Sequence, residues 1–139
     1  MSARVFLDTN ILVYAIEQGG PDPAKSSAAL ELVRRNDICL STQVLGEFYN
    51  AVTSRRRASP LTHDEATAWI QLWKRHDVRD ITVPHVDLAL ELASRFQLSY
   101  YDALIVSAAR HAGCQTLFSE DLNNNQNYDG VAVTNPFHL

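Results

Sequence analysis

Hydrophobic and polar residues alternate along this chain in blocks that predict strands followed by helices. Short runs of β-branched and aromatic residues predict strands, and stretches whose apolar residues recur at helical spacing predict helices. Breakers such as residues 19–23 and Pro60 separate the blocks. We expect strands at 3–8, 37–41, 78–83, 114–119 and 130–135, and helices at 10–18, 24–35, 42–57, 62–76, 84–97 and 101–113.

Residues at the expected helix ends agree with these boundaries. Thr62 and Glu65 have the spacing of a capping box, and Pro84 stands in the first turn of its helix. Gly113 is placed as a C-terminal stop. Strands that alternate with helices predict an α/β fold, in which helices flank a central, mostly parallel sheet.

Length and composition predict a single globular domain over residues 1–139. Of its residues, 46% are hydrophobic and 20% are charged, which excludes a largely disordered chain. The N-terminus lacks the pattern of a signal peptide, and no stretch reaches transmembrane length. Cys39 and Cys114 fall in expected core strands, where free thiols act as small hydrophobes, so we expect a reduced, cytoplasmic protein without a membrane partner.

The net charge of −4 gives no general sign of a nucleic-acid partner, because such a partner usually requires a basic surface. Local charge is more suggestive. Arg55, Arg56 and Arg57 close one expected helix, and Lys74 and Arg75 close another. These cations either bind phosphates or complement the helix dipole, and the second interpretation is favoured.

Four acidic residues stand where the chain leaves an expected strand or enters an expected helix. Parallel sheets bind ligands at the carboxyl ends of their strands. Asp8 ends the first strand, and Asp121 lies just beyond the strand at 114–119. Glu47 lies within two turns of the start of the helix that leaves the strand at 37–41. Asp102 joins them if its helix, which is apolar almost all round, begins at the same edge.

Each acid taken alone has an ordinary structural explanation. Asp8 has the position of a helix N-cap, and Asp102 has the capping-box spacing from Ser99. Glu47 lies at the margin of an apolar stripe, and Asp121 lies among turn-forming residues. Four carboxylates at one edge repel each other unless divalent cations neutralise them, so the set together favours a metal site.

Four motifs follow one another in this order: FLDTNIL, GEFYNAV, YYDALIVSAA and LFSEDL. They resemble the motifs of the PIN-domain ribonucleases, specifically the VapC-type toxins of type II toxin–antitoxin pairs. The resemblance runs from Val5 to Phe137. It implies a PIN-like three-layer fold and a metal-dependent endoribonuclease that cleaves RNA phosphodiester bonds. It also implies a cognate antitoxin protein and a homodimer.

By that resemblance, a quartet of acids holds Mg²⁺ or Mn²⁺ and forms the catalytic site: Asp8, Glu47, Asp102 and Asp121. Thr9 and Ser119 would supply hydroxyls beside it. Asn10 either caps its helix or orients Asp8, and capping is favoured. One departure is that a glycine expected soon after the last acid is delayed to Gly130, although asparagines in the intervening loop tolerate left-handed backbone.

A set of apolar residues is suited either to a groove for the antitoxin or to ordinary core packing: Phe48, Tyr49, Trp69, Leu72 and Trp73. Two other functions stay open. A haloacid-dehalogenase-like phosphatase would use Asp8 as nucleophile but needs a second aspartate where this chain has Asn10. In a non-enzymatic binding module, the acids would only fix loops.

Overall fold

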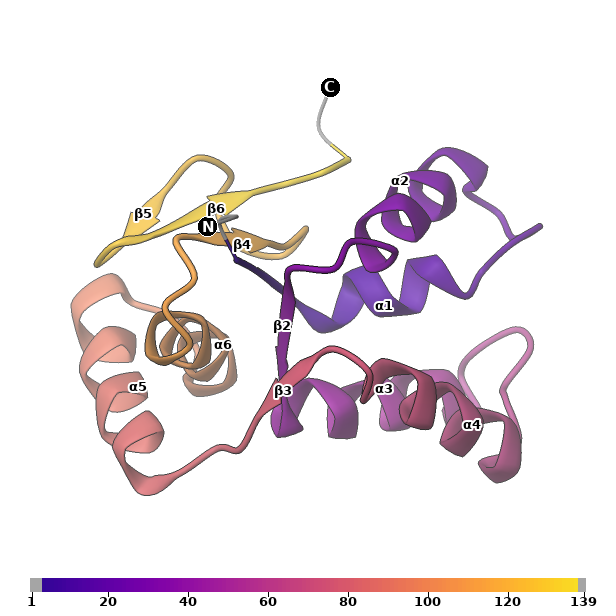
Figure 1. Cartoon of the computed structure of the whole chain (residues 1–139), viewed down its shortest axis with the longest axis horizontal. Helices are drawn as coiled ribbons and strands as arrows, with labels where there is room; N and C mark the ends of the chain where they lie inside the picture. The colour runs from indigo at the N-terminus through magenta and orange to yellow at the C-terminus, as the bar shows by residue number, and fades with distance from the viewer. Residues whose placement is uncertain (1–3, 138–139) are drawn as a thin grey trace.

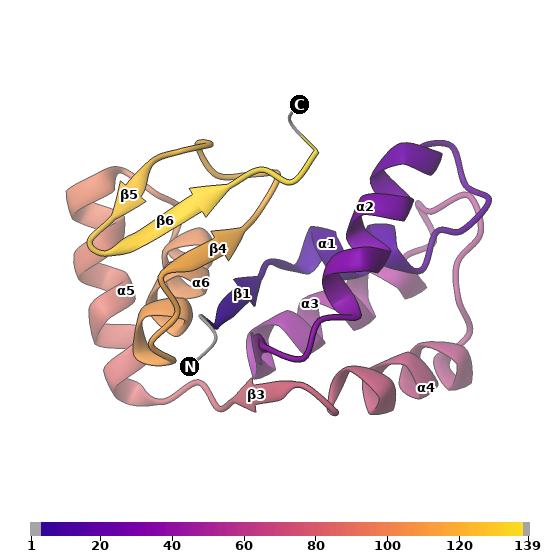
Figure 2. The same cartoon turned by 45° about the horizontal axis from the view of Figure 1, so that its top comes forward.

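The computed structural model describes residues 4–137, which form six helices and one six-stranded sheet (Figures 1 and 2). The strands are β1 (Val5–Leu7), β2 (Ile38–Ser41), β3 (Asp77–Arg79), β4 (Thr116–Phe118), β5 (Asn127–Tyr128) and β6 (Val131–Thr134). The helices are α1 (Thr9–Ala15), α2 (Pro23–Val33), α3 (Thr42–Thr53), α4 (His63–Trp73), α5 (Val83–Phe96) and α6 (Tyr100–His111).

The sheet has the strand order β3-β2-β1-β4-β6-β5, and every neighbouring pair is parallel except β5 with β6. Strand β1 lies near the middle, and its three residues are buried on both faces. Helices α5 and α6 pack against each other, and α6 contacts β2, β4 and β6. The predicted α/β class with a mostly parallel sheet is confirmed. No helix within the described residues is long and apolar enough to cross a membrane.

Expected helix ends are found where the end signals place them. The capping box of Thr62 and Glu65 forms, and Pro84 lies in the first turn of α5. Gly113 follows α6 with a φ of 76°, a left-handed conformation that glycine adopts without strain.

Two expected elements end four residues earlier than their sequence pattern indicates, the largest such differences in the chain. The strand predicted at 78–83 is β3 at 77–79, because β2 offers only Cys39–Ser41 as partners before it turns into α3. Helix α3 ends at Thr53, since Leu61 donates its N–H to the carbonyl of Val52 over 2.8 Å. Arg55, Arg56 and Arg57 therefore lie in the loop beyond α3, and the prediction that they close a helix is wrong.

Strand β5 was not expected, because two residues leave no readable alternation. It forms a hairpin with β6 through Asp129 and Gly130, whose φ angles are 55° and 101°. An Asp-Gly pair suits the left-handed turn that joins two tightly paired strands. Asn125, with φ 68°, confirms that an asparagine of this loop takes the left-handed conformation.

Candidate active site

Asp8 lies directly after β1 and is only 5% exposed. Its Oδ1 accepts the backbone N–H of Thr9 at 2.7 Å, so Asp8 is the N-cap of α1. Its Oδ2 accepts the hydroxyl of Ser119, also at 2.7 Å. Ser119 is fully buried just after β4, the strand paired with β1. One carboxylate therefore starts a helix and faces the carboxyl ends of two central strands.

Glu47 reaches the same place from α3. Its Oε1 accepts the Thr9 hydroxyl at 2.8 Å, and its Oε2 accepts the Gln43 side-chain amide at 3.3 Å. Thr9 therefore links the first strand's end to the third helix across 38 positions of sequence. The expected Thr9 hydroxyl lies beside the acids.

Asp121 approaches from the loop after β4. Its Oδ2 accepts the Asn10 amide at 3.0 Å, and its backbone N–H donates to the Ser119 hydroxyl oxygen at 3.1 Å. Asn10 also accepts the backbone N–H of Glu120 at 3.4 Å. The prediction that Asn10 caps its helix is wrong, because Asp8 already holds the cap position and Asn10 fastens the loop that carries Asp121.

Asp102 lies in the first turn of α6 and is half-buried. Ser99 accepts the Asp102 backbone N–H at 3.2 Å, which caps the helix. The next seven residues, 103–109, are all buried, so the helix enters the core immediately after this acid. Among the described residues, no hydrogen-bond donor meets the Asp102 carboxylate.

All four predicted acids line one cavity of about 620 Å³, which we call the carboxylate cavity. Thr9 and Asn10 line it too. The sequence reasoning missed two further acids in its wall, Glu17 and Glu120, and the polar residues Tyr14 and Asn50. The position of Glu120 next to Asp121 could have indicated that it lies at the site, whereas no sequence feature indicates this for Glu17.

The six acids of the carboxylate cavity fall into two groups by charge pairing. Glu120 forms an ion pair with Lys25 and accepts the Tyr14 hydroxyl at 2.9 Å. Glu17 pairs with Arg57 at 3.2 Å. By contrast, none of the predicted quartet has a basic partner in the described part of the chain: Asp8, Glu47, Asp102 and Asp121. Negative charge in the cavity is therefore concentrated on the quartet.

The pKa of Asp8 reflects this environment and is raised to about 6. Burial is the main cause, because it disfavours the charged form. The hydrogen bonds from Ser119 and Thr9 lower the pKa, while the charges of Asp121 and Glu47 raise it. A carboxylate in this position gains from any cation that enters the cavity.

The residues present fit a hard divalent cation by their chemistry. Each polar side chain around the cavity offers oxygen, from carboxylate, hydroxyl or amide groups, and Mg²⁺ and Mn²⁺ prefer oxygen ligands. Within residues 4–137, however, no three His, Cys, Asp or Glu side chains already lie close enough to hold one ion. Ligation by three carboxylates would therefore need side-chain rotation, which the exposed Asp121 and the unbonded carboxylate of Asp102 permit.

Comparison with known proteins places this geometry in a family. The model of the PIN domain matches residues 5–128, so the chain belongs to the PIN-domain family. PIN domains as a class are nucleases, which supports a hydrolase that cuts nucleic acid. A search of the curated proteins finds no match.

Solved structures of similar fold come from toxin–antitoxin systems. A toxin–antitoxin complex from Klebsiella pneumoniae is 18% identical, with a TM-score of 0.69 over 99% of this chain and 100% of that chain. The Mycobacterium tuberculosis toxin VapC20, which cleaves the sarcin–ricin loop, is 26% identical, with a TM-score of 0.64 over 84% and 91%. VapBC2 from Rickettsia felis, bound to promoter DNA, is 20% identical, with a TM-score of 0.65 over 93% and 96%.

The resemblance to PIN domains of the VapC type is thus confirmed. The phosphatase alternative loses its support, since the family match covers Asp8 and Asn10 and the Asn10 amide is engaged by Asp121.

Proposed function

We propose that this chain is a metal-dependent endoribonuclease that cleaves RNA phosphodiester bonds and acts as the toxin of a type II toxin–antitoxin pair. The observation that carries the proposal is the division of acids in the carboxylate cavity. Two acids have basic partners, and the four that match the family's motif have none among residues 4–137. The similarity to VapC20, a toxin that cleaves the sarcin–ricin loop, supports RNA as the substrate class.

In this proposal Asp8, Glu47, Asp102 and Asp121 hold Mg²⁺ or Mn²⁺. A divalent cation bound there supplies a water of lowered pKa and stabilises negative charge on the phosphate. The protein's own task is positioning. Ser119 holds Asp8 and the backbone of Asp121, Thr9 holds Glu47, and Asn10 holds the Asp121 loop.

Cleavage of RNA by purified protein tests the proposal. Asp102→Asn keeps the size of a side chain whose carboxylate has no bonded partner in the described residues, and it removes one charge. We expect cleavage in Mn²⁺ to fall by about 10²–10³-fold, the typical loss when one preorganised group that stabilises the transition state is removed. Glu17→Gln is the matched control, because Glu17 lines the same cavity but is paired with Arg57. Equal activity in Asp102→Asn and wild type, free of contaminating nuclease, would refute the assignment.

The antitoxin requires a docking surface, and a second cavity of about 830 Å³ between α2 and α4 suits it. We call it the basic cavity. Trp69, Leu72 and Trp73, three residues of the apolar set, line it together with Leu30 and Val33 of α2. The other two residues of the predicted groove lie elsewhere: Phe48 is fully buried in the core, and Tyr49 lines a different hollow.

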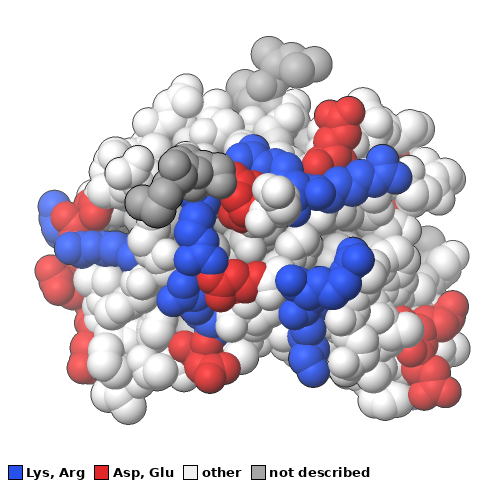
Figure 3. Space-filling model, viewed as in Figure 1, with Lys and Arg blue, Asp and Glu red and all other residues white. Residues whose placement is uncertain are grey.

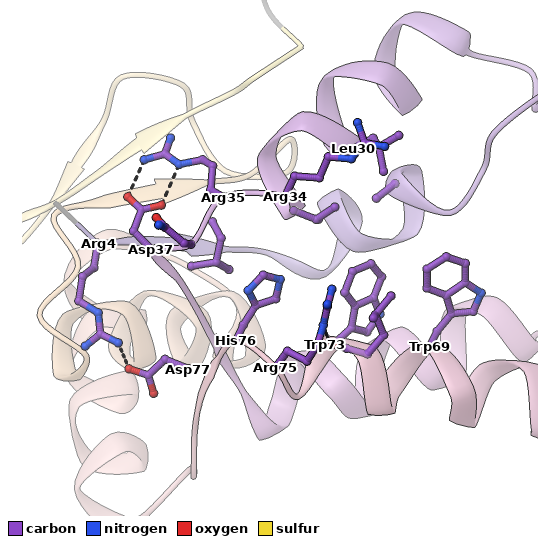
Figure 4. A pocket seen from close by; sticks show the side chains of 15 residues that line it. Arg4, Leu30, Arg34, Arg35, Asp37, Trp69, Trp73, Arg75, His76 and Asp77 are labelled. Carbon is purple, nitrogen blue, oxygen red and sulfur yellow. Dashed lines mark hydrogen bonds and ion pairs between the residues drawn. The ribbon is translucent and has the colours of Figure 1, made fainter. Parts of the chain in front are cut away.

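Charge around the basic cavity indicates the kind of segment that fits. On the face drawn in Figure 3, Lys and Arg surround a hollow, and Figure 4 shows four arginines in the wall of this cavity: Arg4, Arg34, Arg35 and Arg75. Arg4 pairs with Asp77 and Arg35 with Asp37, whereas Arg34 and Arg75 have no acidic partner in the described residues. We therefore propose that an acidic, amphipathic segment of the antitoxin lies there.

An unpaired donor on the apolar floor adds to this argument. Trp73 is 3% exposed, stacks on Trp69 at 5.5 Å between ring centroids, and its buried Nε1 has no acceptor within the described part of the chain. A buried donor without a partner costs free energy that an incoming acceptor recovers.

The homodimer implied by the resemblance stays a prediction. Sedimentation of the purified protein would measure the oligomeric state.

A further inference from the structure

A third hollow adjoins the carboxylate cavity and is not needed to hold a metal. It has a volume of about 690 Å³, and it shares Glu47 and Asn50 with the carboxylate cavity. One wall is helix α3, and the other includes Ile70 of α4 and Tyr101 of α6. We call it the α3 groove. A substrate strand that places a phosphate at the carboxylates therefore has an open path along α3.

The α3 side of the groove is a continuous stripe of helix surface. Gln43, Gly46, Glu47 and Asn50 stand at spacings of three, four and seven residues, which puts them on one helix face. Glu47 is one of the quartet, so this face leads from the proposed site of cleavage into the groove.

Gly46 is the unusual member of the stripe. It is exposed within α3, where glycine is less favourable than alanine. A Cβ built on it would meet no atom within 4 Å, and its backbone is helical. Neither packing nor backbone conformation therefore requires glycine. What its missing side chain does provide is an open floor beside Glu47, where a ligand can approach the helix closely.

Tyr101 forms the opposite rim. Its side chain is 64% exposed, unusually high for a large aromatic residue, although it directly precedes Asp102. Its backbone carbonyl accepts the Gln43 amide at 3.1 Å, and the same amide nitrogen donates to Glu47. Gln43 thus links the backbone of Tyr101 to Glu47 of the acidic site.

Gln43 also has an unused acceptor. Its Oε1 is buried, and no donor reaches it within residues 4–137. Buried polar atoms usually have partners, and the exocyclic amino and ring N–H groups of nucleobases are donors of the right kind. An exposed aromatic ring, an open glycine floor and amide groups from Gln43 and Asn50 together provide what an unstacked base needs: a stacking surface and groups that bond its edge.

We propose that the α3 groove binds one unpaired nucleobase of a single-stranded RNA segment, next to the phosphate held at the carboxylates. The base stacks on Tyr101 and passes over Gly46. This inference rests on the proposed function, because it assigns a subsite of the same reaction. It makes Tyr101, Gly46 and Gln43 residues that bind substrate without ligating metal.

Steady-state cleavage of a short, labelled single-stranded oligoribonucleotide tests the subsite. Tyr101→Ala removes the stacking surface, and Gly46→Leu fills the floor, while Tyr101→Phe and Gly46→Ala are the matched controls. We expect KM to rise about tenfold in Tyr101→Ala and Gly46→Leu with little change in kcat, the usual size of the loss of one stacked base. Both controls should stay within about twofold of wild type, and Mn²⁺ binding should be unchanged in all four variants.

A second set of oligonucleotides identifies the base. Each oligonucleotide carries an abasic ribose at one position. The oligonucleotide that lacks the stacked base should have a KM about tenfold higher than the intact one for the wild-type protein. For Tyr101→Ala, which has already lost the stacking surface, the two should have the same KM. Unchanged KM in Tyr101→Ala and Gly46→Leu overturns the proposal. Anisotropy of the labelled oligonucleotide on the Asp102→Asn background measures groove binding without cleavage, and equal affinity with and without Tyr101→Ala overturns it too. Absence of cleavage by wild type would instead count against the proposed function.

Discussion

The carboxylate cavity and the basic cavity lie at opposite ends of the parallel strands, and they differ in how their acidic side chains are paired. Asp8 and Ser119 follow the carboxyl ends of β1 and β4, whereas Arg4, Asp37 and Asp77 lie at the amino ends of β1, β2 and β3. At the amino ends, both acids are paired with arginines. At the carboxyl ends, four of six acids have no basic partner in the described residues.

This difference shows what each cavity lacks. The carboxylate cavity has excess negative charge that no basic side chain of the described residues neutralises, and a cation from outside would do so. The basic cavity has two arginines without an acidic partner and an indole N–H without an acceptor within residues 4–137, and the proposed acidic segment would supply what all three need.

The largest effect should come from expressing the chain without a partner. If the unpaired acids form a ribonuclease site, induction should arrest growth, and Asp8→Asn should abolish the arrest, as measured by colony-forming units. Coexpression of the cognate antitoxin should restore growth to the wild-type chain. An arrest that persists in a soluble, equally expressed Asp8→Asn variant would mean that toxicity arises from aggregation or sequestration.

The second prediction separates the two cavities. The double variant Arg34→Glu and Arg75→Glu reverses the charge of the two arginines in the basic cavity that have no acidic partner in the described residues. It should weaken antitoxin binding about a hundredfold while RNA cleavage stays unchanged. Titration calorimetry measures the affinity. Lys74→Glu is the control, because Lys74 is exposed beside Arg75 but does not line the cavity. If Lys74→Glu weakens binding equally, general attraction and not this cavity explains the affinity.

The third prediction concerns stability in EDTA. The pKa of Asp8 rises from 3.8 in the unfolded chain to about 6 in the folded protein, so the folded state prefers the protonated form. Its charge therefore costs stability above about pH 6, and the cost disappears as the pH falls toward 3.8. Asp8→Asn should raise the free energy of unfolding by about 3 kcal/mol at pH 7.

Urea unfolding of both proteins between pH 7 and pH 4 measures this difference. The gap between Asp8→Asn and wild type should narrow steadily through pH 6 and close near pH 4. A gap that is independent of pH would show that packing or hydrogen bonding, rather than the buried charge, causes the change.

The smallest effect concerns the arginines after α3. Arg57 is engaged by Glu17, so only the exposed Arg55 and Arg56 are available to phosphates. A plot of log affinity for RNA against log salt concentration has a negative slope. Replacing all three arginines by serine should make this slope less steep by about one to two. An unchanged slope would exclude these arginines from the RNA contact.

The sequence was sufficient to predict that the four acids gather, because each stands near a strand end or a helix start. The edge of a parallel sheet then brings such positions together, and Asp8, Glu47, Asp102 and Asp121 do line one cavity. Thr9 and Ser119 were predictable for the same reason, since they adjoin these ends. The early end of β3 and the two-residue β5 were not, because the lengths of these strands depend on what the neighbouring strand offers.

Pairings between distant positions could not be read from the sequence. Lys25 reaches Glu120 across 95 positions and Arg57 reaches Glu17 across 40, and these pairs decide which acids remain unpaired. The role of Asn10 was misjudged for a related reason: its partner Asp121 lies 111 positions away, whereas the cap interpretation used only local spacing.

Calorimetric titration of Mn²⁺ into the purified protein tests the metal site by itself, because it needs neither substrate nor partner. Wild type and Glu17→Gln should bind Mn²⁺ alike, whereas Asp8→Asn and Asp102→Asn should each lose at least about tenfold in affinity. Glu17 lines the same cavity but is paired with Arg57, so the comparison isolates the unpaired acids. Equal Mn²⁺ affinity in all four proteins, or no binding by wild type, would contradict the metal site and leave the acids as supports for loops.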